Sequence, residues 1–369
     1  MNFYKDVVEH RGKLLVRGVH DGQEFKEKVS FRPTMYANTQ EETNHKTLQG
    51  NYLKPITFES ISKAREFKRS YATSNSPLYG NDRWHFQYIS KEYPQQIEFD
   101  KTLIKIFTID IETTAEGGFP DVNNPEEEII CLTIKNQSNK QIITWGTKPF
   151  FVKQDNVTYI ECSNEKQLLM EFFKFWTKNY PDVITGWNTK FFDIPYLCNR
   201  TKRLVGDKVI NKLSPWGLIE EEQLTVRGRQ QTIFKITGIS NLDYLDLYIK
   251  FIPQRQESYK LDYIAKVELG GDGKDNNPYE TFREWYKNDF QSFVEYNIKD
   301  VELVDRLEDK LKLIELIMTM AYEAKVNYTD VFSEVRLWDT LIYNHLLKEN
   351  IHIPPRTDNI KNEICWCIC

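Results

Sequence analysis

The sequence has no long apolar run and no apolar segment near its first residue. No stretch approaches the roughly 18 consecutive apolar residues that a membrane-spanning helix needs. Residues 1–11 mix charged and apolar side chains, which is not the pattern of a secretory signal. We therefore expect an intracellular protein without a membrane span.

Cysteine is also scarce, with six in 369 residues. Cys131, Cys162 and Cys198 are scattered, so we expect free thiols in the interior rather than a disulfide framework. Cys365, Cys367 and Cys369 end the chain. A CxCxC pattern without a histidine or a second cluster is a weak match to a zinc site.

What is present indicates a folded, globular protein. Hydrophobic residues make up 40% and aromatic residues 14% of the chain, far above the level of disordered segments. The length favours two or three domains. A net charge of −5 does not exclude nucleic acid as a partner, because binding depends on local basic patches and a metal-dependent nuclease concentrates acids at its centre.

Residues 1–102 predict a small α+β domain. Strands are expected over 13–17 and 25–31 and a helix over 61–69, capped by Ser60. This segment is slightly more basic than acidic, so it suits either a nucleic-acid-binding domain or a plain scaffold. We favour the scaffold.

From residue 103 the pattern changes to that of a mixed sheet flanked by helices. The central strand holds Ile106 to Glu112, and two apolar runs at 128–135 and 141–145 predict a hairpin beside it. An amphipathic helix over 165–180 precedes a short buried strand at 183–185. Later segments predict helices over 259–266, 289–324 (broken once) and 335–347.

The central strand carries two acids at its end. Asp110 and Glu112 are two residues apart, so they project from the same face of a strand. Neighbouring carboxylates repel each other and resist desolvation, and a divalent cation would remove both penalties. The alternative is a pair of exposed strand-end acids.

Three further residues extend this pattern. Asp193 precedes a helix that we expect to begin at Pro195, and Tyr296 and Asp300 lie one above the other on a helix face. Four carboxylates in one cleft would suit two divalent ions about 3.5–4 Å apart, the arrangement used in phosphoryl transfer. Oxygen ligands favour magnesium or manganese over zinc.

Two other segments could contact phosphates. Residues 223–237 alternate around Arg227 and Arg229, which predicts a β-hairpin with a basic tip that either contacts a DNA backbone or is simply exposed. We favour the DNA contact. The glycine-rich stretch 270–274 lacks the Gly-Lys-Ser/Thr order of a phosphate loop, so nucleoside triphosphate binding is not expected there.

Three motifs then carry a resemblance to a known family. Phe107-Thr-Ile-Asp-Ile-Glu-Thr113, Asn188-x-x-x-Phe-Asp193 and Tyr296-x-x-x-Asp300 resemble the proofreading 3′→5′ exonucleases with the DEDD-type site, tyrosine subclass. Thr185-Gly-Trp-Asn and Leu242-Asp-Tyr-Leu-Asp-Leu-Tyr are similar to family B replicative DNA polymerases of T-even-type bacteriophages. The similarity continues through 335–339 and covers most of the chain.

The resemblance implies a ribonuclease-H-like fold and a role for each acid. Asp110 would bridge two magnesium or manganese ions, while Glu112 and Asp300 would bind the ion that carries the nucleophile. Asp193 would hold the other ion, partly through water, and Tyr296 would orient the attacking water.

The resemblance also implies contacts with DNA. Asn188 would touch the terminal nucleotide, and Phe119 would stack near its base. Lys274 resembles a family lysine that reaches the scissile region, with a spacing that differs by one residue. The hairpin with Arg227 and Arg229 would match the element that helps to separate primer from template.

We therefore expect a 3′→5′ exonuclease domain at 103–325, with residues 326–369 returning to the domain at 1–102. The palm motifs Asp-x-x-Ser-Leu-Tyr-Pro and Gly-Asp-Thr-Asp are missing, so we expect no nucleotide addition by this chain alone. The chain would be a fragment or one half of a split polymerase, acting in the cytoplasm of an infected host cell. An RNA 3′ exonuclease and a binding or polymerase-assembly module with weak nuclease remain alternatives.

Overall fold

The computed structural model describes residues 1–71, 77–226, 228–271 and 279–355. The chain divides into two compact units. One comprises Phe99–Met320 with Met1 and Val19–Gln23, and the other comprises Asn2–Gly18, Glu24–Glu98 and the chain from Ala321 onward. The expected functional domain boundaries at 102 and 325 stay a prediction, because compact units and functional domains need not coincide.

A six-stranded mixed sheet forms the centre of the unit that contains Phe99–Met320. Its strands are β8 (Ile106–Thr113), β9 (Ile129–Asn136), β10 (Ile142–Gly146), β11 (Val157–Glu161), β12 (Val183–Thr185) and β15 (Ser240–Asn241), in the spatial order β11-β10-β9-β8-β12-β15. Strands β8, β9 and β10 pair antiparallel, whereas β11, β12 and β15 join through parallel pairs. The predicted α/β class with a mixed sheet is confirmed.

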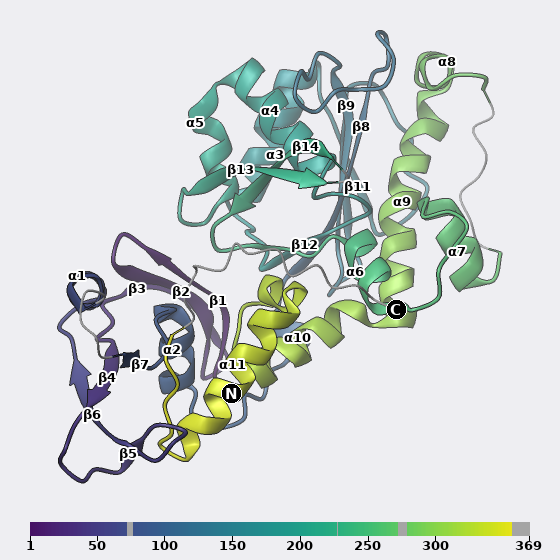
Figure 1. Ribbon diagram of the computed structural model, residues 1–369. Coiled ribbons are helices and arrows are strands. Elements are labelled where there is room, and N and C mark those ends of the chain that lie inside the picture. The colour runs from purple at the N-terminus through teal and green to yellow at the C-terminus, as the bar shows by residue number, and fades with distance from the viewer. Residues whose placement is uncertain (72–76, 227, 272–278, 356–369) are drawn as a thin grey trace. The chain divides into compact units, whose positions relative to one another are not determined.

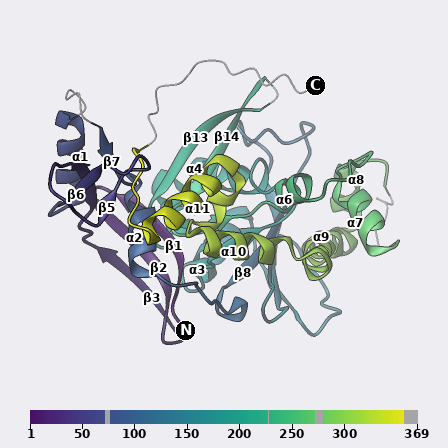
Figure 2. The ribbon, with the colours of Figure 1, turned by 60° about the horizontal axis from the view of Figure 1, so that its bottom comes forward.

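Some helices of this part of the chain pack on the two faces of the sheet, and others lie beside those helices or follow them along the chain. They are α3 (Glu165–Trp176), α4 (Asp193–Val205), α5 (Asp207–Ile210), α6 (Tyr244–Phe251), α7 (Leu261–Leu269), α8 (Phe282–Asn288), α9 (Phe290–Leu311) and α10 (Leu313–Ala324), with short 3-10 turns at Lys101–Leu103 and Asn211–Leu213. Figure 1 shows α3 and α4 on one side of β8 and β9 and α9 on the other. In Figure 1, α7 lies beside the lower part of α9 and α8 lies at its upper end, and both helices contact α9. Figure 2 shows these three helices from another direction.

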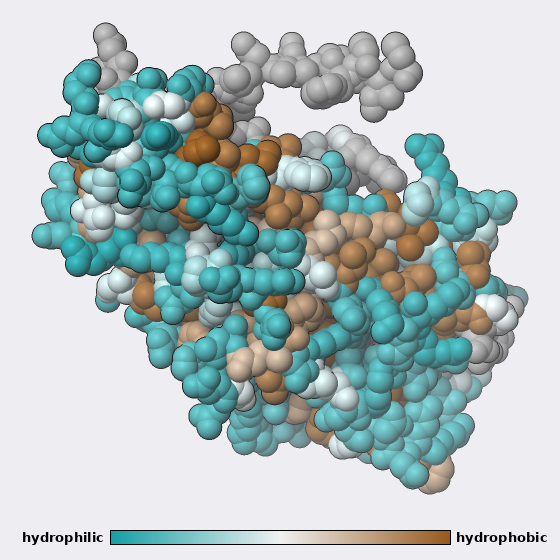
Figure 3. All heavy atoms as spheres, turned by 90° about the horizontal axis from the view of Figure 1, so that it is seen from below, coloured by the Kyte–Doolittle hydropathy of each residue, from teal (hydrophilic) through white to brown (hydrophobic). Residues whose placement is uncertain are grey.

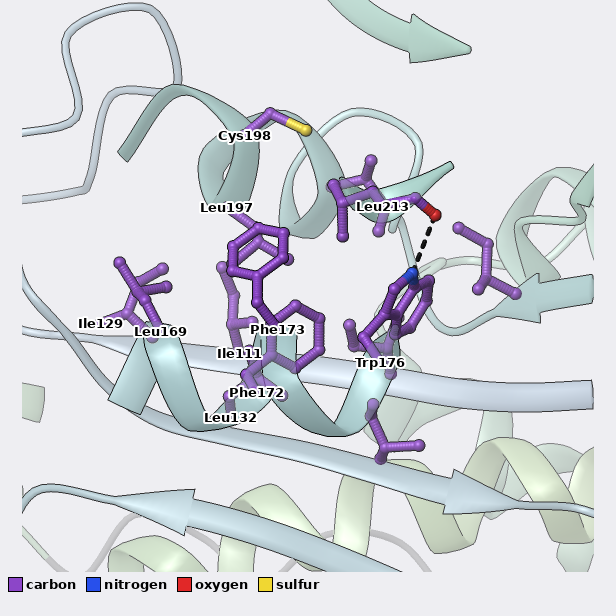
Figure 4. Packing of buried hydrophobic residues seen from close by; sticks show 14 of the residues in the cluster. Ile111, Ile129, Leu132, Leu169, Phe172, Phe173, Trp176, Leu197, Cys198 and Leu213 are labelled. Atoms are coloured by element: carbon purple, nitrogen blue, oxygen red, sulfur yellow. Dashed lines mark hydrogen bonds between the residues drawn. The ribbon is translucent and has the colours of Figure 1, made fainter. Parts of the chain in front are cut away.

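The larger core lies between the sheet and α3. Leu168, Leu169, Phe172, Phe173 and Trp176 recur at helical spacing and are all buried, as their pattern predicts. Figure 4 shows this face of the helix packed on the sheet, with the Trp176 indole donating a 2.8 Å hydrogen bond to the carbonyl of Leu213. The hydrogen bond lets a large aromatic side chain be buried without leaving its N–H unsatisfied.

Several helix ends differ from the predicted ones. Helix α3 ends at Trp176 instead of Tyr180, because the Thr177 hydroxyl donates to the Phe173 carbonyl as the chain turns toward Pro181. Helix α7 begins at Leu261, since the Ser258 hydroxyl accepts from the Lys260 N–H in a turn that precedes the helix. The expected break in the long helix is confirmed at Lys312, where φ is +54°.

A two-stranded ribbon projects from the same unit. Strands β13 (Ile219–Val226) and β14 (Arg229–Ile236) pair antiparallel over their whole length, so that Val226 faces Arg229 across the turn. The predicted hairpin is therefore present, and its first strand begins earlier than the expected residue 223. Its tip residue Arg227 lies outside the described residues, and the side chain of Arg229 is not described.

The second unit holds two small sheets. Its strands are β1 (Phe3–His10), β2 (Lys13–His20), β3 (Gln23–Val29), β4 (Thr34–Asn38), β5 (His45–Lys46), β6 (Tyr52–Thr57) and β7 (Leu78–Tyr79), and its helices are α1 (Ile61–Tyr71), α2 (Trp84–Glu92) and α11 (Glu334–Lys348), with a 3-10 turn at Tyr328–Phe332. They form the sheets β1-β2-β3 and β5-β6-β4-β7. The Tyr4 hydroxyl donates to the Val326 carbonyl at 2.6 Å, and the Tyr322 hydroxyl donates to the Tyr4 carbonyl at 2.9 Å. These bonds tie the first strand to the last turn of α10 and to the chain that follows it.

The face shown in Figure 3 is mainly hydrophilic with apolar patches among the hydrophilic residues. Among the most exposed large apolar side chains are Phe119, Phe151 and Trp338. Within the described ranges, no helix has both the length and the apolar character needed to cross a membrane.

Candidate active site

Strand β8 directs its side chains to both faces of the sheet in turn. Phe107, Ile109 and Ile111 are buried in the core on the α3 side. Alternation then places Asp110 and Glu112 on the opposite face, toward α9. Both side chains are only partly buried. The two acids therefore share a face because the apolar residues that alternate with them along β8 occupy the opposite face.

Helix α9 brings a third acid to that face. Asp300 is 5% exposed, and one carboxylate oxygen each from Asp110, Glu112 and Asp300 lies within 4.8 Å of the others. Tyr296 lies one turn earlier on the same helix and packs edge-on against Trp285, with ring centroids 4.9 Å apart. The structure thus gathers residues that are separated by almost two hundred positions in the sequence.

Asp193 approaches from the start of α4. It is the first residue of that helix, whereas the sequence suggested a helix start at Pro195. Its Oδ1 accepts a 3.0 Å hydrogen bond from the Ile111 N–H, which fixes the end of α4 to the central strand. Burial raises the pKa of Asp193 to about 7, although this hydrogen bond acts in the other direction. Asp193 lines the same cleft as the other three acids.

The loop before α4 is held by a residue that sequence reasoning missed. Asp243 is almost fully buried, and its carboxylate accepts from the N–H groups of Asn188 at 3.1 Å and Lys190 at 2.9 Å. It also caps α6 by accepting from the Leu245 N–H at 3.0 Å. Burial raises the pKa of Asp243 to about 6. No task was predicted for Asp243, because its two partners in the loop lie more than 50 positions away in the chain.

This support holds Asn188 in an uncommon conformation. Its φ is +68°, in the left-handed region that non-glycine residues rarely adopt. The preceding Gly186 packs directly on β8, where an added Cβ would lie 2.4 Å from the Ile109 carbonyl oxygen. Asn188 lines the cleft, so the strain is stored beside the acids.

The acids open into a cleft of about 1470 Å³. Phe119 lies on its wall with 90% of its side chain exposed, and its ring centroid is 5.9 Å from that of Phe192. Gln231 of β14 also lines the cleft, so the hairpin reaches it. An exposed aromatic ring beside a cleft is available for stacking on a nucleobase.

Among the described lining residues, Lys260 is the single lysine or arginine. It is exposed and precedes the first residue of α7. Nothing in the sequence distinguishes it from other lysines, because its position at the cleft depends on how α7 packs. Lys274, which the resemblance suggested for a similar role, lies outside the described residues.

The donor set fits a divalent cation. Carboxylate oxygens are the ligands that magnesium and manganese prefer, and bringing three negative groups together without a counter-ion costs free energy. Asp110, Glu112 and Asp300 could therefore hold such an ion. No nearby cysteine or histidine belongs to this cluster of described residues, which distinguishes it from the usual zinc sites.

Comparison with known proteins agrees with this geometry. Residues 78–264 match the model for the exonuclease domain of family B DNA polymerases. The chain belongs to this family. Family membership supports an exonuclease role, and exonuclease domains of this family use divalent metals.

Relatives of the exonuclease-domain family include two phage polymerases. The chain is 29% identical to the DNA-directed DNA polymerase of Enterobacteria phage T4 over 97% of its own length, and 31% identical to that of Escherichia phage RB69 over 95%. It covers 42% of each relative. The DNA polymerase delta catalytic subunit of Candida albicans is 26% identical over 70% of this chain. The chain therefore spans less than half the length of these polymerases.

Proposed function

We propose that the chain is a metal-dependent 3′→5′ exonuclease that removes nucleoside 5′-monophosphates from single-stranded DNA ends. The observation that carries this proposal is the meeting of Asp110, Glu112 and Asp300 at a cleft large enough for a nucleotide. Family membership supports the reaction class. Proofreading beside a polymerase palm, in the same chain or a separate one, is the proposed setting.

The proposal gives each carboxylate a task. Asp110 would contribute to both metal positions, Glu112 and Asp300 would hold the ion on the side of the attacking water, and Asp193 would hold the second. Two bound ions would supply a water of lowered pKa and would offset charge on the leaving oxygen. The burial of Asp193 in the cleft wall and its raised pKa suit an acid that ionises fully only when a cation is present.

Tyr296 and the cleft walls position the reactants. The Tyr296 ring is held by Trp285, and we assign its hydroxyl the role of orienting the attacking water. Asn188 contacts the terminal nucleotide and Phe119 stacks on its base, since both line the cleft. Lys260 is a further candidate for a contact with a DNA phosphate. Arg227, Arg229 and Lys274 keep their proposed DNA contacts as predictions.

Release of mononucleotide from 5′-labelled single-stranded DNA tests the proposal. We expect stepwise shortening from the 3′ end with Mg²⁺, none with EDTA, and none from the Asp110→Ala/Glu112→Ala variant. Asp309→Ala is the matched control, because Asp309 is an acid on α9 that pairs with Lys140 and does not line the cleft. Wild-type turnover by the double variant would refute the assignment.

The same assay separates the alternatives. Matched DNA and RNA oligonucleotides distinguish a deoxyribonuclease from an RNA exonuclease, because that choice depends on how the cleft meets the 2′-OH. A folded sample that binds DNA but shortens neither substrate would indicate a binding or polymerase-assembly module.

A further inference from the structure

Asn297 lies directly behind the acid cluster and contacts one of its members. It is a residue of α9 with no exposed surface, one position after Tyr296. Its amide Nδ2 donates a 2.6 Å hydrogen bond to Oδ2 of Asp110. The motif Tyr296-x-x-x-Asp300 spans this asparagine without giving it a task, and the asparagine does not line the cleft.

Cys131 fixes the orientation of that amide. Its thiol donates to Oδ1 of Asn297 over 3.2 Å, from the neighbouring strand β9. A thiol is a weak donor and a weak acceptor; here it donates to the amide oxygen, and an ionised Asp110, which can only accept, takes the NH₂ group. The opposite orientation would place the amide oxygen against a carboxylate. Both neighbours of Asn297 therefore favour the same arrangement.

The hydrogen-bond chain from Cys131 to Asp110 begins in the interior and ends at a partly buried carboxylate. Cys131 and Asn297 are both fully buried, and Cys131 faces Glu112 across the strand pair. A buried hydrogen bond without competing water holds its partners in one geometry more strictly than an exposed bond does. The carboxylate of Asp110 is consequently restrained from inside the protein, while its edge toward the cleft remains part of the acid cluster.

We propose that Asn297 is a positioning residue that orients the Asp110 carboxylate for divalent-metal binding, with Cys131 setting the direction of its amide. This rests on the proposed metal-dependent function. A neutral amide suits the place, because a lysine would compete with the cation for Asp110, and another carboxylate would add repulsion. Residues that orient metal ligands from behind change metal affinity by about 10–100-fold when they are replaced.

Direct Mn²⁺ binding tests the proposal without relying on turnover. Free Mn²⁺ is counted by electron paramagnetic resonance during titration of the whole chain without DNA. We expect Asn297→Ala to weaken binding by about 10-fold. Cys131→Ala should weaken it by a smaller factor, and Cys131→Ser should stay near wild type because serine retains a donor. Nuclease activity of Asn297→Ala should recover at high Mg²⁺.

Asn327→Ala is the control for simple loss of stability. Asn327 is another buried asparagine, and its amide donates to the Val7 carbonyl and accepts from the Val7 N–H, each at 2.9 Å. Its replacement should lower the melting temperature in EDTA without changing Mn²⁺ affinity. A folded Asn297→Ala protein with wild-type Mn²⁺ affinity would overturn the inference.

Two other outcomes are also decisive. If Asn297→Ala does not fold, equal Mn²⁺ affinity in wild type, Cys131→Ala and Cys131→Ser overturns the proposal, whereas the graded order supports it. If wild type itself binds no Mn²⁺ while folded, the proposed metal-dependent function fails, and the inference fails with it. The wild-type titration therefore separates the two failures.

Discussion

Asp193 gives a sharp prediction because its environment differs between the folded and unfolded states. Its side chain is 2% exposed, and burial raises its pKa from the ordinary 3.8 to about 7. Each unit of difference in pKa between the two states corresponds to about 1.36 kcal/mol. The interval from 3.8 to about 7 therefore amounts to roughly 4 kcal/mol as an upper value.

The sign follows from proton binding. A carboxyl with a raised pKa holds its proton more tightly in the folded state, so its contribution to stability is fully present below about pH 4. That contribution is lost as the pH rises from about 4 through 7. Without metal, wild-type protein should thus be destabilised at pH 8 by an ionised and buried Asp193. Asp193→Asn removes this titration and keeps an oxygen that can accept from the Ile111 N–H.

Urea unfolding in EDTA measures the effect. The stability gap between Asp193→Asn and wild type should widen in favour of the variant by roughly 2–3 kcal/mol between pH 5 and pH 8. Adding Mg²⁺ at pH 8 should stabilise wild type more than the variant, because the variant has lost a proposed ligand. The variant should also be nearly inactive as a nuclease.

The matched control is Asp309→Asn, which changes an exposed acid on α9. For this variant the gap should stay constant between the two pH values. The reasoning about Asp193 is refuted if its own gap is the same at pH 5 and pH 8, or if the variant is less stable than wild type at pH 8 without metal.

Two further predictions follow from contacts around the cleft. Lys260→Ala should weaken single-stranded DNA binding and reduce the slope of log affinity against log salt by about 0.7, which corresponds to the loss of one phosphate contact. The control Lys266→Ala, on α7, should leave both the affinity and the slope unchanged. Equal slopes for wild type and Lys260→Ala would exclude the contact. Arg200→Met should lower the free energy of unfolding by about 3–5 kcal/mol in urea titrations, because it strands the buried carboxylate of Glu165, to which Arg200 donates at 2.8 and 2.6 Å. Adding Glu165→Gln should restore much of that loss, and a double variant no more stable than the single one would contradict the explanation.

Much of the fold could be predicted from local sequence patterns. The alternation in β8 and the apolar face of α3 follow from periodicity, whereas the sequence indicated a break in the long helix without its position. The predicted helix ends differed from the observed ones at Trp176 and Leu261, because a single capping or turn hydrogen bond determines where a helix begins or ends. The expected roles of the four acids and Tyr296 stay predictions.

The roles of the residues that support the site could not be predicted from local sequence patterns. Asp243 looks like an ordinary helix cap, and Lys260 looks like one of many surface lysines. Asn297 stands in a motif, yet nothing local indicates which way its amide points. Their functions depend on partners that lie far away in the chain, such as Asp110, which is 187 positions from Asn297.

The sequence by itself determined the acids, their spacing and the elements that carry them, because strand and helix periods translate spacing directly into a shared face. Only the tertiary structure decided which faces meet, and hence that Asn297 lies behind Asp110 and that Asp243 holds the Asn188 loop. The physical reason is that a buried polar group must find a partner wherever the packing places one, and that partner is not encoded at any fixed distance along the chain.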